Sequence, residues 1–119
     1  MANPFVHVEL NSSDFKKSRA FYEQLFNWKL QDISMPDGST YSLIDVGGEG
    51  TGGGMMQHPV PGAPSMWLAY IAVDDIHVST EKAKSLGANV IRDVTVIPQG
   101  SFSILEDPTG AVFALWKPA

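Results

Sequence analysis

Apolar and polar positions alternate through residues 5–10 (FVHVEL), which is the pattern of a half-buried strand. Phe5, His7 and Glu9 point to one side of this strand, and three aliphatic residues point to the other. The aliphatic residues already complete an apolar face, so packing does not require the opposite face to be apolar. The alternation therefore predicts a first strand with two ionisable side chains facing solvent, an interface or a pocket.

The next segment changes to a helical period. Residues 11–14 (NSSD) supply oxygens that can cap a helix, and apolar residues then recur at three- and four-residue spacing. This spacing predicts an amphipathic helix whose inner face consists of Phe15, Ser18, Phe21, Tyr22, Leu25 and Phe26. An extended segment at 28–35 and a strand at 41–46 follow, and the glycine-rich residues 47–54 predict a turn leading into 55–57.

The same order of elements then returns. Three prolines within residues 58–64 indicate a connector, because proline cannot donate to a sheet ladder. A strand at 67–73 precedes an Asp74-Asp75 cap and a second helix closed by Gly87, and extended segments follow at 89–96, 101–105 and 111–116. The inner face of that second helix is predicted to hold Ile76, Thr80, Ala83 and Leu86.

The pattern thus predicts an α+β fold of two tandem βαβββ modules. Residues 1–119 form a single domain, with module one at 4–57, a proline-rich connector at 58–66 and module two at 67–118. Sliding the chain by 61, the separation of Asp14 from Asp75, aligns five identical residues without a gap. Because these identities fall where both halves have the same element order, a tandem duplication is expected.

This alignment also compares the two first strands. His7 falls opposite Leu68, and Glu9 falls opposite Tyr70. The polar face of the first strand is therefore apolar in its counterpart.

Composition narrows the classes of function. With 119 residues the chain is long enough to bury a hydrophobic core without disulfide or metal cross-links, and it contains no cysteine. Eight Lys and Arg against 13 Asp and Glu give a net charge of −5, with the cations scattered, which opposes nucleic-acid binding. No apolar run approaches the roughly 18 residues that span a bilayer. A cytoplasmic protein without nucleic-acid or membrane partners is expected.

Two segments carry a resemblance to a known family. The helix opening at residues 14–22 (DFKKSRAFY) and the closing turn and strand at 107–113 (DPTGAVF), set within the duplicated pattern, resemble the vicinal oxygen chelate superfamily. That superfamily includes glyoxalase I, extradiol dioxygenases, and fosfomycin- and bleomycin-resistance proteins. Residues 52–56 (GGGMM) and 111–116 (AVFALW) are similar to a glyoxalase-related branch of unsettled activity. The resemblance implies curved mixed sheets around a concave pocket.

In metal-dependent members of this superfamily, each module supplies one ligand from its first strand and one from its last. Carried over by position, the first-strand residues are His7 and Leu68, and the last-strand residue of module two is Ala114, where the family has Glu. The module-one equivalent falls at Gly54 or a near neighbour. Only His7 remains of four ligands, whereas a catalytic metal normally has three protein donors. No metal and no other cofactor is therefore expected.

Eight residues are predicted to bind a ligand. His7 is interpreted mainly as a neutral, hydrogen-bonded pocket histidine, and in the alternative interpretation the charge of Glu9 keeps its imidazole protonated. Tyr70 and Trp116 share faces with these positions, whereas Tyr41 and Phe102 are interpreted as core residues. The full predicted set is His7, Glu9, Met55, Gln57, Leu68, Tyr70, Ala114 and Trp116, with His58 as a further donor if its segment turns inward.

Two functions remain open at this stage. The first is metal-independent binding of a small, largely apolar or aromatic molecule in a pocket at a homodimer interface, as the bleomycin-resistance type implies. The alternative is a metal-dependent enzyme of glyoxalase or dioxygenase type, with a reduced metal site built on His7 and Glu9. A purely structural role is the third possibility, and no catalytic residue is assigned.

Overall fold

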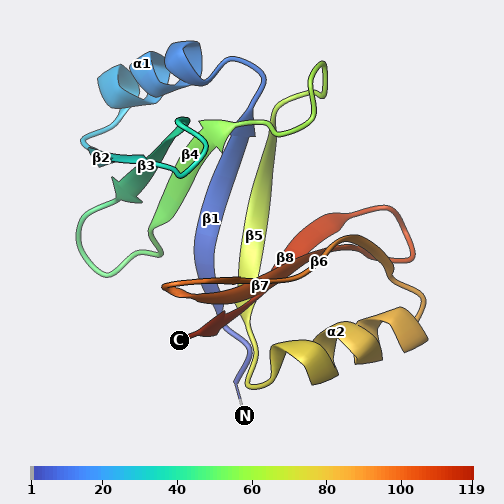
Figure 1. Ribbon diagram of the computed structural model, residues 1–119. Coiled ribbons are helices and arrows are strands. Elements are labelled where there is room, and N and C mark those ends of the chain that lie inside the picture. Colours follow the sequence, from blue (N-terminus) through green and yellow to red (C-terminus); the bar gives the residue numbers. More distant parts are fainter. Residues whose placement is uncertain (1) are drawn as a thin grey trace. The chain divides into compact units, whose positions relative to one another are not determined.

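The computed structural model describes residues 2–119 and confirms the α+β fold of two βαβββ modules (Figure 1). The first five elements are β1 (Phe5–Ser12), α1 (Phe15–Leu25), β2 (Lys29–Ser34), β3 (Thr40–Asp45) and β4 (Gly53–Gln57). The next five are β5 (Met66–Ala72), α2 (Ile76–Ser85), β6 (Asn89–Ile97), β7 (Gly100–Glu106) and β8 (Val112–Pro118). Within the described residues, neither helix has the length and apolar character needed to cross a membrane.

The chain divides into two compact units. The module-one unit is His7–Leu68, and the module-two unit is Ala69–Ala119 together with the N-terminal segment up to Val6. That segment belongs to the module-two unit because Asn3 donates a hydrogen bond to the Ala72 carbonyl, and the Ala72 amide donates to Pro4. The organisation as a single domain with a connector at 58–66 stays a prediction.

The module-one sheet has the strand order β2-β3-β4-β1, with β1 parallel to β4 and the other neighbours antiparallel. Gly53 and Gly54 lie within β4, so the prediction that they end a glycine-rich turn is wrong. Their lack of side chains serves close packing instead. A Cβ on Gly53 would lie 1.9 Å from the carbonyl oxygen of Val8 on the neighbouring strand. A run of glycines occurs both in turns and in strands that another backbone approaches closely, so composition alone does not distinguish the two.

The module-two sheet repeats this arrangement in the order β5-β8-β7-β6, with β5 parallel to β8. The register fixes equivalent positions on the last strands of the two units. Glu9 pairs with Gly54, and Tyr70, the counterpart of Glu9, pairs with Ala114. Gly54 is therefore the module-one equivalent of Ala114.

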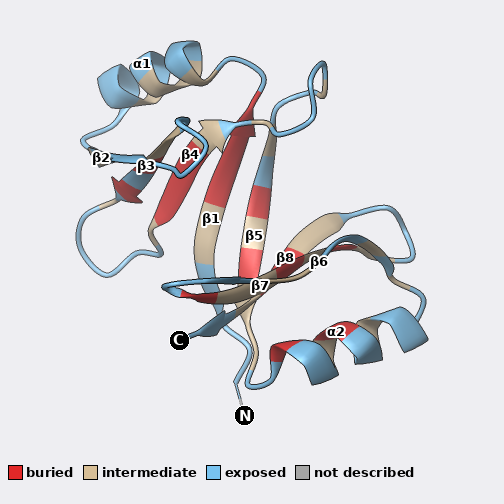
Figure 2. Ribbon diagram, in the orientation of Figure 1, coloured by how far each residue is buried: buried red, intermediate tan, exposed pale blue. Residues whose placement is uncertain are grey.

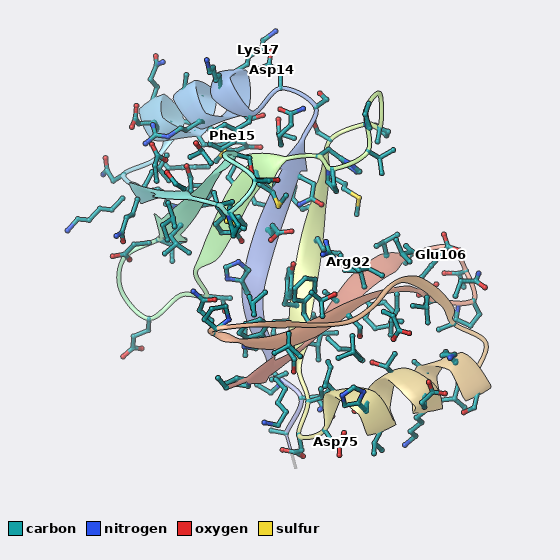
Figure 3. All side chains as sticks on the ribbon, viewed as in Figure 1. Asp14, Phe15, Lys17, Asp75, Arg92 and Glu106 are labelled. Carbon is teal, nitrogen blue, oxygen red and sulfur yellow. The ribbon has the colours of Figure 1, made fainter. Side chains whose placement is uncertain are left out.

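Helix α1 begins at its predicted cap, where the Asp14 carboxylate accepts a hydrogen bond from the Lys17 amide (Figure 3). Only part of its predicted inner face is inside. Phe15 and Tyr22 pack against the core cluster of Leu10, Ile44 and Met55. The prediction is wrong for three residues that remain 44–56% exposed: Phe21, Leu25 and Phe26. Figure 2 shows the same result, with α1 exposed or half-buried along its whole length.

Helix α2 is capped by Asp75, whose carboxylate accepts from the amides of His77 and Val78. Ile76 is buried in a core cluster with Leu105 and Leu115, and Ala83 packs against that cluster. The Thr80 hydroxyl hydrogen-bonds Ser103. Gly87 ends this segment with φ +102°, as predicted. The prediction is wrong for Leu86, which is 69% exposed and lies just beyond the last residue of α2, as its C-cap.

Each sheet therefore has one face packed against its helix and one opposite face, called here the helix-free face. Alternation along β1 and β4 puts Leu10 and Met55 toward α1, so that Glu9 and Gly54 point to the helix-free face. In the module-two unit, Leu105 and Leu115 face α2. Tyr70 and Ala114 consequently lie on the helix-free face of that unit.

Candidate functional site

Strand β1 places three polar side chains on the helix-free face of the module-one unit. His7, Glu9 and Asn11 follow one another at two-residue spacing, so they project to the same side. Glu9 and Asn11 are each only 6% exposed, and His7 is half-buried. A carboxylate so poorly hydrated needs hydrogen-bond donors, which the surrounding side chains supply.

The donors to Glu9 come from two strands. The Tyr41 hydroxyl on β3 donates to Glu9 Oε1 over 2.8 Å, and Asn11 Nδ2 donates to Glu9 Oε2 over 2.8 Å. His7 Nε2 lies 2.8 Å from the same Tyr41 oxygen. No buried side-chain polar atom within residues 2–119 lacks a partner. We call these four residues, His7, Tyr41, Glu9 and Asn11, the polar network.

The direction of these hydrogen bonds assigns the tautomer of His7. A phenol has a single hydrogen, and that of Tyr41 is donated to Glu9. His7 Nε2 must therefore carry a proton and donate it to the Tyr41 oxygen, so a neutral ring would be the Nε2–H tautomer.

Electrostatics favours the neutral ring. Burial lowers the pKa of His7 below its ordinary value, and this effect is larger than the opposing attraction of the Glu9 carboxylate, which raises the pKa. The expectation that Glu9 holds the imidazole protonated is therefore not supported. The neutral, hydrogen-bonded state that was the main interpretation agrees with the geometry.

Gly54 is what lets Tyr41 reach the network. In the order β3-β4-β1, the Tyr41 side chain must cross β4 to contact β1. A Cβ built on Gly54 would lie only 1.9 Å from the Tyr41 hydroxyl and 2.2 Å from its Cζ. The Tyr41 phenol therefore occupies the space that any side chain at position 54 would need.

Two predicted ligand residues are separated from His7 and Glu9. Met55 is fully buried in the core against α1, on the opposite side of the sheet. The Gln57 side chain accepts from the Phe15 amide and donates to the Ser13 carbonyl, so it holds the start of α1. His58 is exposed, and its Nδ1 accepts from the Val60 amide. The proposed inward turn of this segment therefore does not bring a third donor to the polar network.

The remaining predicted residues lie on or next to β5 and β8. Leu68 is 1% exposed and belongs to the module-one unit. In the module-two unit Tyr70 pairs with the fully buried Ala114, and its ring lies 6.4 Å from that of Phe102. Trp116 is half-buried and directly opposite Phe102 across the β7–β8 ladder. These aromatic residues form the helix-free face of that unit.

The residues present do not fit the metal that the family resemblance implies. Within residues 2–119, no group of three or more His, Cys, Asp or Glu side chains is placed to hold a metal ion. The space beside Gly54, where the module-one last strand would provide a ligand, is taken by the Tyr41 phenol. His7 and Glu9 are hydrogen-bonded to that phenol. The module-two counterparts of His7 and Gly54 are Leu68 and Ala114, neither of which has a metal-binding side chain.

Sequence reasoning missed Tyr41 and Asn11 as members of the site. Tyr41 had been interpreted as a core residue and Asn11 as part of a helix cap. A signal for Asn11 was available, because it continues the two-residue spacing of His7 and Glu9. For Tyr41 the signal is the glycine on the strand between it and Glu9, which becomes visible only once the strand order is known.

Comparison with known proteins gives the same fold. The mycobacterial protein CFP32 (Mycobacterium tuberculosis), named provisionally as a glyoxylase, is 38% identical over 101 residues, covering 84% of this chain and 38% of that protein. The anthracycline biosynthesis protein DnrV of Streptomyces peucetius is 29% identical over 126 residues, covering 92% of this chain and 45% of that protein. The chain thus spans less than half the length of these curated relatives.

Solved structures resemble the fold at low sequence identity. Methylmalonyl-CoA epimerase from Mycobacterium tuberculosis superposes with a TM-score of 0.72 at 15% identity, covering 97% of this chain and 87% of that one. A hypothetical protein from Bacillus halodurans C-125 gives 0.75 at 15% identity, covering 100% and 96%. The family model for glyoxalase/bleomycin resistance protein/dioxygenase matches residues 5–115. The chain therefore belongs to the glyoxalase/bleomycin resistance protein/dioxygenase superfamily.

Proposed function

We propose that this chain binds a small, largely apolar or aromatic molecule without a metal ion, in a pocket that a second copy of the chain closes. One observation carries the proposal. The Tyr41 phenol joins His7 to Glu9 and fills the space beside Gly54, so the ionisable groups of β1 are tied into hydrogen bonds. A metal site would need three donors, and no third His, Cys, Asp or Glu within residues 2–119 is placed to complete one with His7 and Glu9.

The surroundings of the polar network suit an apolar ligand. Leu43 and Met56 project to the same helix-free face as Glu9 and Gly54, by the alternation of β3 and β4. In the module-two unit, the corresponding face carries the half-buried Phe102 and Trp116, with the buried Tyr70 against Phe102. Small-molecule sites typically combine such apolar walls with a few fixed polar groups, which the polar network would supply.

The name of one relative supports this class of ligand. DnrV is named for anthracycline biosynthesis, and anthracyclines carry an aromatic polycycle. Light scattering tests the dimer part of the proposal and should show a dimer.

A thermal-shift screen with planar apolar compounds tests the binding proposal. We expect compounds that raise the melting temperature of the wild type, with smaller shifts for Tyr70→Ala and Trp116→Ala. Trp67→Ala is the matched control, because Trp67 is an aromatic residue on the same strand as Tyr70 but contacts Tyr22 of α1. Shifts that are unchanged in both test variants, or no shift from a broad set of planar compounds, would overturn the proposal.

Elemental analysis separates this proposal from a reduced metal site on His7 and Glu9. Protein purified without chelator is expected to carry no stoichiometric transition metal. The alternative is favoured by the convergence of His7 Nε2 and Glu9 Oε1 on one oxygen. One equivalent of metal in the wild type that is lost in His7→Ala would establish the enzyme-type alternative instead.

A further inference from the structure

Strand β6 contains two irregularities that change the direction of Arg92. Val90 pairs with Leu105 on β7, but Arg92 pairs with Ile104, so two residues of β6 advance against one of β7. Between Arg92 and Thr95 three residues advance against two. Both are β-bulges, which insert an extra residue and re-aim the side chains beside it.

The bulges bring Arg92 onto the helix-free face. With regular alternation Arg92 would point to the same side as Val90, which packs against the core beneath α2. Its partner Ile104 instead lies between Leu105 and Ser103, whose side chains face α2, so Ile104 and Arg92 face away from the helix. Figure 3 shows Arg92 on the side of the sheet away from α2.

The Arg92 guanidinium lies over an aromatic surface and has no acidic partner. Its Cζ is 5.3 Å from the centre of the Phe102 ring, and its Nε donates to Thr95 Oγ1 over 3.2 Å. Within residues 2–119 it makes no ion pair, and its two terminal nitrogens donate no hydrogen bond. The adjacent Asp93 carboxylate accepts from the Val94 amide. Phe102 and Thr95 thus position the guanidinium, and the N–H groups of its two terminal nitrogens remain available to donate hydrogen bonds to a ligand.

We propose that Arg92, together with Phe102, forms a subsite for the carboxylate end of an aromatic ligand. The proposal rests on the proposed function and specifies its ligand class as a planar aromatic carboxylate. A guanidinium matches a carboxylate with two parallel hydrogen bonds. The half-buried Phe102 ring, on which the guanidinium lies, offers edge contacts to the aromatic body.

Titration calorimetry with 2-naphthoate and the neutral isostere 2-naphthamide tests the subsite. In the wild type, 2-naphthoate should bind about tenfold more tightly, because hydrogen bonds between charged groups are the stronger ones. Arg92→Gln should lose this preference while still binding 2-naphthamide, and Arg92→Lys should keep part of it, because it retains the charge without the fork. Arg92 is exposed, so these variants are expected to fold, and their melting temperatures check this.

Lys84→Gln is the matched control. It removes one positive charge from the same unit, but Lys84 lies on α2 and pairs with Glu81. It should keep the wild-type preference for 2-naphthoate. Equal binding of both compounds by the wild type, or equal loss of preference in Lys84→Gln, overturns the subsite and leaves the proposed function standing. Failure of both compounds to bind overturns the subsite and counts against the proposed function as well.

Discussion

The helix-free faces of the two units occupy equivalent positions of a repeated scaffold and have opposite chemistry. In the module-one unit Tyr41 donates its hydroxyl hydrogen to Glu9. In the module-two unit the counterparts of these residues are Phe102 and Tyr70, whose ring centres lie 6.4 Å apart. The pair that joins the two strands is thus a hydroxyl and a carboxylate in one unit and two aromatic rings in the other.

The comparison teaches which part of the fold the sequence can vary. In both units the sheet face toward the helix carries the apolar core, with Leu10 and Met55 in one and Leu105 and Leu115 in the other. The opposite faces do not carry these helix-packing clusters. Their residues can therefore change from polar to aromatic without removing the core that stabilises each module.

The largest expected effect comes from making the last strands of the two modules, β4 and β8, carry the same residue at equivalent positions. Gly54→Ala gives the module-one unit the residue that module two has at Ala114. Because the new Cβ would lie 1.9 Å from the Tyr41 hydroxyl, the ring must move and the network must break. We expect a loss of about 2–4 kcal/mol in the free energy of unfolding, measured by urea denaturation.

A double-mutant cycle identifies the cause of that loss. In a Tyr41→Ala background the obstructing ring is absent, so adding Gly54→Ala should cost much less, with a coupling above about 1 kcal/mol. Gly50→Ala is the control, since its nearest neighbour is the end of the Val46 side chain at 3.1 Å. Additive effects of the two substitutions would show that Gly54 is needed for some reason other than Tyr41.

A smaller effect is expected when only the hydroxyl is removed. Tyr41→Phe gives β3 the side chain that Phe102 has on β7, and it takes one hydrogen-bond partner each from His7 and Glu9. Unfolding in urea should show a loss of about 1–2 kcal/mol. Tyr22→Phe is the control, because the Tyr22 ring packs in an aromatic cluster and its hydroxyl makes no hydrogen bond within residues 2–119. Equal effects of the two substitutions would contradict a stabilising network.

The smallest effect concerns the charge state of His7, which has no counterpart at Leu68. Because burial lowers its pKa, the unfolded chain binds a proton near the ordinary value of 6.5 while the native state does not. The contribution to stability is therefore present above pH 6.5 and is lost as the pH falls below that value. Urea denaturation between pH 7.5 and 5 should show this decline, and His7→Gln should reduce it.

Nuclear magnetic resonance titration of the imidazole provides the sharper measurement. The His7 signal should titrate below pH 6.5, and Glu9→Gln should move it lower still, because the carboxylate raises the pKa. A midpoint above 6.5 in the wild type would mean that Glu9 outweighs burial. The polar network would then carry an imidazolium ion.

Much of the candidate site could be predicted from local patterns, and the rest could not. Two-residue spacing correctly put His7 and Glu9 on one face of β1. Their pairing with Leu68 and Tyr70 through a duplication stays a prediction. The prediction for Met55 is wrong because a glycine-rich segment is typical of a turn, and this interpretation conceals the alternation of β4. Its neighbour Met56 is the methionine on the helix-free face.

The surface of α1 shows the same limit for a helix. Spacing identified an apolar stripe, but it could not say how much of that stripe the four-stranded sheet would cover. Tyr22 packs against Trp28 and the core, while Phe21 and Leu25 remain exposed. Periodicity reports which residues share a side of a helix, and the area available for packing depends on the elements beneath it.

By itself the sequence determined the order of elements, the duplication of βαβββ and the sharing of faces within each strand. These follow from periods of two and 3.6 residues and from cap and turn chemistry, which act over a few neighbouring residues. Only the tertiary structure decided that Tyr41 crosses Gly54 to reach Glu9, and that bulges turn Arg92 onto Phe102. Strand order and register join residues distant in the chain, and no local period encodes them.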